Sequence, residues 1–202
     1  GVDAESAVAY LLGATDINGI TESNLSKSLI IMVANTTQYE GVTYMWRDGS
    51  AVAVCTRSDL AYPNDARGLI QHEAGGHGFG KLGDEYIYHQ AFIQMCSCID
   101  GCGHVEELNS NKALGWYRNL SLDGRYGNHE WRHLIFDSRY SDIVDIYEGG
   151  YFHSRGVYRS EANSCMNNNV PYFSTVSRQA IVERIMDYAG EAFDFETFVS
   201  RD

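Results

Sequence analysis

Two histidines and a glutamate in the middle of the chain have the types and nearly the spacing of a zinc site. His72 and Glu73 are adjacent, and His77 follows five residues after the first histidine. In the common H-E-x-x-H arrangement, histidines four residues apart differ by about 40° around an α-helix, so both rings reach one zinc ion. The glutamate then stands beside the water that the metal activates. The sequence predicts zinc ligands at His72 and His77 and a general base at Glu73.

The spacing between the histidines is one residue too long for a regular helix. Five residues correspond to about 140° around an α-helix, which would point His72 and His77 to different sides. A π-bulge accommodates one extra residue and returns the rings to one face. Gly75 and Gly76 lie between the histidines, although each interior glycine costs a helix about 1 kcal/mol relative to alanine. We therefore predict a π-bulge here; the alternative is that His77 is an ordinary loop or core histidine.

Two segments of the chain carry a family resemblance. From His72 to Tyr86 the sequence reads HEAGGHGFGKLGDEY, which resembles the signature of the bacterial IgA peptidase family of metzincin-like zinc metallopeptidases. Residues 156–166, GVYRSEANSCM, resemble the family's stretch that leads to the methionine of a Met-turn, here Met166. The resemblance extends over about residues 28–189, which is most of the chain.

The resemblance implies a third metal ligand after a sharp turn that ends the helix. Asp84 is the predicted ligand, with Glu85, His89 or a glutamate from elsewhere in the chain as alternatives, while a solvated acidic loop is the non-functional reading. The chain departs from the family pattern in two places: His72 and His77 are five rather than four residues apart, and Asp84 is displaced by one position.

The function implied is that of a zinc-dependent endopeptidase, with Zn²⁺ as cofactor and Glu73 accepting a proton from the attacking water. A catalytically weak or inactive zinc-containing surface binding module is the alternative. We expect a monomer with a protein or peptide substrate, and the resemblance implies an extracellular or cell-surface protein of bacteria. The candidate donors to a developing oxyanion, between which the sequence does not choose, are Tyr151, His153, Tyr158 and Arg159.

The elements that must position these residues indicate an α+β fold. The resemblance makes it a metzincin-like domain, with a twisted mixed sheet and active-site helix followed by a helix- and loop-rich part. The predicted elements are a helix at 5–12, a strand at 28–34 covered on both faces, a hairpin of strands 42–46 and 51–56 around a turn at 47–50, a zinc helix capped at 62–65, helices near 104–114 and 130–136, and a C-terminal helix that Ser174 or Ser177 caps and Gly190 ends.

We expect residues 1–202 to form one catalytic domain, with the sheet and zinc helix in residues 1–84 and the Met-turn in residues 85–202. The resemblance implies that a strand and a helix come before residues 28–34, and that only the end of this region lies in the chain. In the metzincin arrangement the outer strand of the hairpin, expected at residues 51–55, would bind an extended substrate by strand addition.

The cysteines and one glycosylation sequon add alternatives but no active site. Cys96, Cys98 and Cys102 could form a short disulfide, or a structural zinc site with His104, although this spacing lacks the usual C-x2-C pair. Cys55 and Cys165 stand apart, so the disulfide pattern stays open. Asn119 begins an N-x-S sequon, which is a common chance match.

Composition excludes some classes of function. The chain has 202 residues, of which 44% are hydrophobic, which is enough for a folded core. Lys and Arg number 15 against 27 Asp and Glu, for a net charge of −12. This balance argues against a nucleic-acid backbone or an anionic membrane surface as the main ligand. We see no apolar run long enough to span a membrane.

Overall fold

The computed structural model describes residues 3–13, 21, 23–95 and 103–202. Its contacts divide the chain into two compact units, Gly1–Phe79 and Gly80–Asp202. The boundary lies a few residues before the one expected at 84/85. Each unit has its own sheet.

The first unit has a three-stranded sheet in the order β1-β3-β2. Its strands are β1 (Leu29–Ala34), β2 (Gly41–Met45) and β3 (Ala51–Thr56). β3 runs parallel to β1 and antiparallel to β2. A turn between β2 and β3 closes with a hydrogen bond from the Gly49 amide to the Trp46 carbonyl, which confirms the predicted hairpin. The helical turn η1 (Leu25–Lys27) comes before β1.

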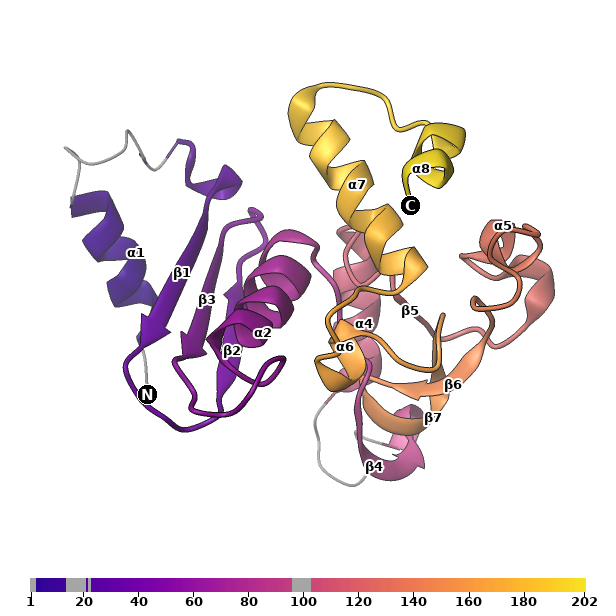
Figure 1. Ribbon diagram of the computed structural model, residues 1–202, viewed down its shortest axis with the longest axis horizontal. Helices are drawn as coiled ribbons and strands as arrows, with labels where there is room; N and C mark the ends of the chain where they lie inside the picture. The colour runs from indigo at the N-terminus through magenta and orange to yellow at the C-terminus, as the bar shows by residue number, and fades with distance from the viewer. Residues whose placement is uncertain (1–2, 14–20, 22, 96–102) are drawn as a thin grey trace. The chain divides into compact units, whose positions relative to one another are not determined.

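The central strand β3 is buried along its whole length because helices cover both of its faces. Helix α1 (Ala4–Gly13) contributes Ala4 to a core cluster with Val52 and Val54. Figure 1 shows α1 and α2 (Ala66–Ile70) on opposite sides of this sheet. Val52 and Val54 face α1, so alternation along the strand points Cys55 to the opposite face.

Two expectations for this sheet are wrong. The strand near 28–34 is not covered on both faces, because Ile31 and Val33 are 46% and 54% exposed; β1 is at the sheet edge, and the helix after α2 packs mainly against β3 and β2. The segment at 51–55 is not the outer strand of the hairpin. Because β3 returns between β1 and β2, the outer strand is β2.

Helix α2 begins where the sequence predicts. The Asp65 side chain accepts hydrogen bonds from the amides of Arg67 and Gly68 and caps the helix. Gly68 is required at this point, since a Cβ there would lie 1.6 Å from the Pro63 carbonyl oxygen. The cap thus fixes the residue at which the helix begins, and the histidines follow in its continuation.

The second unit has a sheet centred on β7 (Phe152–Arg159). β4 (Ile87–Phe92) pairs with β7 in parallel, whereas β5 (Leu120–Ser121) and β6 (Tyr147–Gly150) pair with it antiparallel. The sequence predicts loops and helices here and misses this sheet. Its strands are short or irregular, and β4 and β7 come from segments some 60 residues apart, so no local pattern reveals them.

The helices of the second unit pack around a core that includes Trp131, Leu134 and Phe198. The predicted C-terminal helix is confirmed: Ser174 caps it, and Gly190 ends it in a left-handed conformation. The helix near 104–114 is also confirmed, and the one near 130–136 is shorter than predicted. The helical elements are η3 (Ile93–Met95), α4 (His104–Ala113), η4 (Tyr126–Asn128), α5 (Arg132–Ile135), α6 (Cys165–Asn168), α7 (Thr175–Ala189) and α8 (Phe195–Arg201).

The protein is therefore α+β, with two mixed sheets and several helices. Within the residues that the structure describes, every helix is too short or too polar to cross a membrane.

Candidate metal centre

The histidines lie on a π-helix, η2 (Gln71–Phe79), which continues α2. In a π-helix each amide bonds to the carbonyl five residues before it, so residues five apart lie one turn apart. The rings of His72 and His77 accordingly face each other edge to face, with centroids 4.9 Å apart. The predicted π-bulge is confirmed, and it extends over the whole histidine segment instead of a single turn.

Asp84 joins these histidines in a possible metal-binding group. One ligand atom from each of His72, His77 and Asp84 lies within 4.8 Å of the others. Both histidines are buried, and Asp84 is partly buried. Two imidazoles and one carboxylate form a donor set used by catalytic zinc sites, which leave a fourth position open. The residues present therefore fit a zinc ion by chemistry and by proximity.

The alternative third ligands, Glu85 and His89, are not part of this group. Glu85 is fully buried and accepts hydrogen bonds from Ser164 and Asn119. The His89 ring packs against that of His153, with centroids 5.2 Å apart. Of the three candidates, only Asp84 is brought to the histidines.

Glu73 lies on the same helix and is only 6% exposed. The Thr43 hydroxyl of β2 lies 2.8 Å from its Oε2 atom and 3.0 Å from its carbonyl oxygen. Gly41, on the same strand, leaves room for the carboxylate, since a Cβ there would lie 2.6 Å from Glu73 Oε1. Strand β2 therefore positions the predicted general base in two ways. The Thr43 hydroxyl is hydrogen-bonded to its carboxylate, and Gly41 leaves space for that carboxylate.

Cys55 of the central strand β3 is a buried thiol without a disulfide. Burial, and then the negative charge of Glu73, raise the pKa of Cys55 to about 12. The thiol thus stays protonated at neutral pH, so it behaves as a core residue rather than as a nucleophile.

Tyr86 supports Asp84 directly. Its hydroxyl is hydrogen-bonded to the Asp84 carboxylate, and burial and that carboxylate raise the Tyr86 pKa. Carboxylates that ligate metals are commonly held by a second hydrogen bond of this kind. The phenol stays neutral and can keep donating while Asp84 binds a cation.

Met166, the predicted methionine of the Met-turn, is fully buried in a cluster with Leu82 and Ala180. Its carbonyl oxygen accepts a hydrogen bond from the Glu85 amide at 2.7 Å. The Met166 segment is thus bonded to the residue directly after Asp84.

Three of the four candidate oxyanion donors form side-chain hydrogen bonds within the second unit. Arg159 donates to the carbonyls of Glu148, Gly149 and Ala162. His153 Nε2 lies 2.9 Å from His104 Nδ1. Tyr151 is hydrogen-bonded to Glu107 and Tyr117, and the Tyr158 ring packs where Gly124 leaves space. The cysteine cluster of residues 96, 98 and 102 lies outside the described residues.

Four side chains that support the site were missed from the sequence: Thr43, Tyr86, Asn119 and Ser164. Tyr86 had a signal, since it ends the Asp-Glu-Tyr run. Thr43 had a weak one, as a hydroxyl in a strand next to a glycine. Asn119 and Ser164 lie 34 and 79 residues after Glu85, which they bind, and nothing local marks them.

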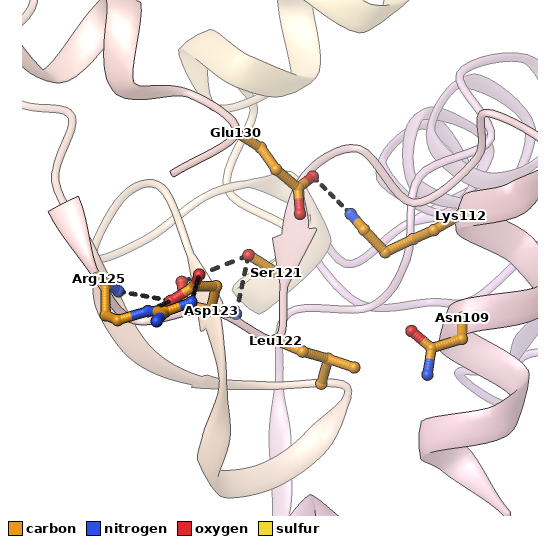
Figure 2. Close-up of a pocket in the computed structure, with 7 residues that line it drawn as sticks. All are labelled: Asn109, Lys112, Ser121, Leu122, Asp123, Arg125 and Glu130. Carbon is orange, nitrogen blue, oxygen red and sulfur yellow. Dashed lines mark hydrogen bonds and ion pairs between the residues drawn. The ribbon is translucent and has the colours of Figure 1, made fainter. Parts of the chain in front are cut away.

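Figure 2 shows a polar hollow of the second unit beside the strand that contains Ser121. Its charged groups pair with each other: Lys112 with Glu130, and Asp123 with Arg125, at 2.6 and 2.7 Å. These pairs neutralise the hollow, so it offers no net charge to a ligand.

Comparison of the chain with protein-family models and with curated proteins found no match in either case. The function is therefore proposed from the chemistry and geometry of the chain's own residues.

Proposed function

We propose that this protein is a zinc-dependent endopeptidase of the metzincin-like kind that the bacterial IgA peptidase family represents. One observation carries the proposal: a π-helix corrects the irregular spacing of His72 and His77, and their ligand atoms gather with that of Asp84. π-Helical segments are rare and are often found at functional sites. A chance histidine pair would not need one.

The protein's own side chains supply the remaining chemistry. When bound, zinc would provide a Lewis acid that activates water and polarises the scissile carbonyl. Glu73 accepts the proton of the attacking water and passes it to the leaving amine. Thr43 donates to the Glu73 carboxylate, which restricts the rotation of that carboxylate.

The edge strand β2 is the best support for an extended peptide substrate. Within the described residues, β2 pairs only with β3, and its other edge is therefore open to strand addition. Thr43 on this strand contacts Glu73, so a peptide added along β2 would run past the general base. This replaces the strand at 51–55 that the sequence favours.

Metal analysis combined with a Glu73→Gln variant tests the proposal. We expect about one zinc ion per chain, cleavage of a broad peptide library by the wild type, and loss of cleavage in Glu73→Gln without loss of zinc. General-base catalysis typically contributes about 10²–10⁴-fold, which sets the size of the expected drop. Glu106→Gln, an exposed change on α4, serves as the matched control.

Two outcomes would contradict the proposal. A protein that binds no zinc would lack the metal centre. A Glu73→Gln variant that cleaves like the wild type would remove its general base. Zinc binding without any cleavage would instead favour the surface binding module.

A further inference from the structure

The segment that carries Asp84 has no regular secondary structure, yet its backbone is bonded almost continuously. Residues 81–86 lie between the π-helix and β4. Buried backbone amides and carbonyls outside helices and sheets need hydrogen-bond partners from elsewhere in the chain. Four backbone hydrogen bonds of 2.7–2.9 Å join this segment to the rest of the unit. They run from Tyr117 N to Lys81 O, from Tyr151 N to Asp84 O, from Glu85 N to Met166 O, and from Phe152 N to Tyr86 O.

The Asn119 side chain makes three hydrogen bonds with this segment. Its Oδ1 atom accepts from the Gly83 amide at 2.9 Å, and its Nδ2 atom donates to the Gly83 carbonyl at 2.8 Å. The same Nδ2 atom donates to Glu85 Oε1 at 2.9 Å. One buried amide thus fixes the residues on both sides of Asp84. Because the Asn119 side chain is buried and fully used, its sequon is not accessible in the folded protein.

Ser164 completes the contact from the other side. Its hydroxyl donates to Glu85 Oε2 at 2.5 Å, and it accepts from the Met166 amide at 3.1 Å. Both Glu85 oxygens are therefore held, one by Asn119 and one by Ser164. Glu85, Asn119 and Ser164 are hereafter called the amide–carboxyl network.

The residue that bears the amide is itself anchored. Lys112 Nζ donates to the Leu120 carbonyl at 2.6 Å and pairs with Glu130 at 2.6 Å, as Figure 2 shows for the ion pair. Lys112 therefore fixes the backbone directly after Asn119. The anchoring extends from α4, through Asn119, to the segment around Asp84.

We propose that the amide–carboxyl network positions Asp84, so that the third metal ligand is in place before a metal binds. Asn119, Glu85 and Ser164 touch neither the metal nor the substrate in this account, and they are positioning residues. The inference rests on the proposed role of Asp84 as a ligand. A ligand that is already ordered loses less conformational entropy on binding, so loosening it weakens metal affinity.

A purely structural role for the network predicts something different. In that case Asn119 would stabilise the fold without affecting the metal more than any other buried amide does. Gln179 is such an amide: it is buried, lies near His133 at 2.9 Å, and donates to Glu183. The two roles separate when zinc affinity and stability are measured in the same variants.

The test measures zinc affinity by chelator competition in Asn119→Ala, Asn119→Asp and Ser164→Ala, with Gln179→Ala as the matched control. Loss of an outer-shell contact typically costs about 10–100-fold in metal affinity, and we expect this range for the Asn119 and Ser164 variants. Gln179→Ala should bind zinc within about twofold of the wild type, since it has no contact with the network. Urea unfolding of the metal-free proteins shows which variants are folded.

A double-mutant cycle then tests whether the network acts by positioning Asp84 or by stabilising the fold in general. If the network acts through Asp84, adding Asn119→Asp to an Asp84→Ala protein should cause no further loss of zinc affinity. Additive losses would overturn the inference. Should the Asn119 variants fail to fold, Ser164→Ala decides in the same cycle, because it leaves the amide of Asn119 intact.

The outcomes separate this inference from the proposed function. Folded network variants with wild-type zinc affinity overturn the inference alone. Weakened zinc binding in a protein that cleaves no peptide supports the inference and removes the peptidase function. A wild-type protein that binds no zinc, or an Asp84→Ala variant that keeps full affinity, overturns the inference, because no ligand is then left to position.

Discussion

The helix that bears the histidines and the loop that bears Asp84 are held in place by opposite means. In η2 the histidines are ordered by the helix itself and by the Asp65 cap just before it. Residues 81–86 form no regular element, and several of their hydrogen bonds go to residues 117–166 of the second unit. One part of the candidate site is determined locally and the other by distant segments.

This difference predicts how each part responds to mutation. A helix held by its own hydrogen bonds tolerates the loss of one side chain beside it, so changes there should remove only that side chain's chemistry. A loop held by distant partners should lose its geometry when any partner is removed. The four experiments below test this contrast, from the largest expected effect to the smallest.

Removing a histidine should have the largest effect on zinc. Structural zinc sites contribute roughly 10–16 kcal/mol, so one of four ligands contributes on the order of 3–4 kcal/mol, or about 10²–10³-fold in affinity. We expect His77→Ala to lose this much in chelator competition while metal-free stability changes little, because the helix remains. A large loss of stability without metal would show that the histidine is structural.

The loop should respond to pH through Glu85. Burial raises the pKa of Glu85 to about 7 from its ordinary value of 4.5, although Ser164 and Asn119 partly oppose this by donating hydrogen bonds. Below pH 4.5 the carboxyl is neutral in both the folded and unfolded protein. Between pH 4.5 and 7 only the unfolded protein ionises, so the free energy of unfolding should fall by about 3 kcal/mol as pH rises.

Glu85→Gln should remove this decline. The amide is neutral at all these pH values, and its oxygen and nitrogen can pair with Asn119 and Ser164 respectively. Urea unfolding of both proteins at pH 4 and pH 8, with a chelator present, measures the difference. Parallel stability profiles for wild type and variant would mean that Glu85 titrates normally.

The extent to which the sequence predicts this protein follows the same contrast. Features that depend on residues close together in the sequence are predicted correctly. They are the hairpin turn, the Asp65 cap, the π-helical geometry and the C-terminal helix. The β7 sheet and the contacts of Asn119 and Ser164 depend on pairing between distant segments, and each was missed. Asp84 itself was found only because the family resemblance supplied what spacing alone does not.

Thr43 of β2 contacts Glu73 on the histidine-bearing helix, and Thr43→Val should lower turnover without changing zinc affinity. Valine has nearly the shape of threonine but cannot donate to Glu73, so the carboxylate gains freedom to rotate. We expect kcat to fall about tenfold, a part of the 10²–10⁴-fold due to a general base, with KM and zinc affinity unchanged. Thr43→Ser, which restores the hydroxyl, should recover most of the rate; a serine variant as slow as the valine one would assign the effect to packing.

The smallest effect should come from Lys112, which is two contacts away from Asp84. Lys112→Met keeps the aliphatic stem but removes the bonds to Leu120 and Glu130, and the segment with Asn119 gains some freedom. Because Asn119 keeps its own bonds to the loop, we expect zinc affinity to fall only about threefold, below the range for direct outer-shell contacts. Arg125→Met, which breaks the other ion pair of the same hollow, is the control. If both variants lowered zinc affinity equally, charge near the hollow, and not anchoring of Asn119, would be responsible.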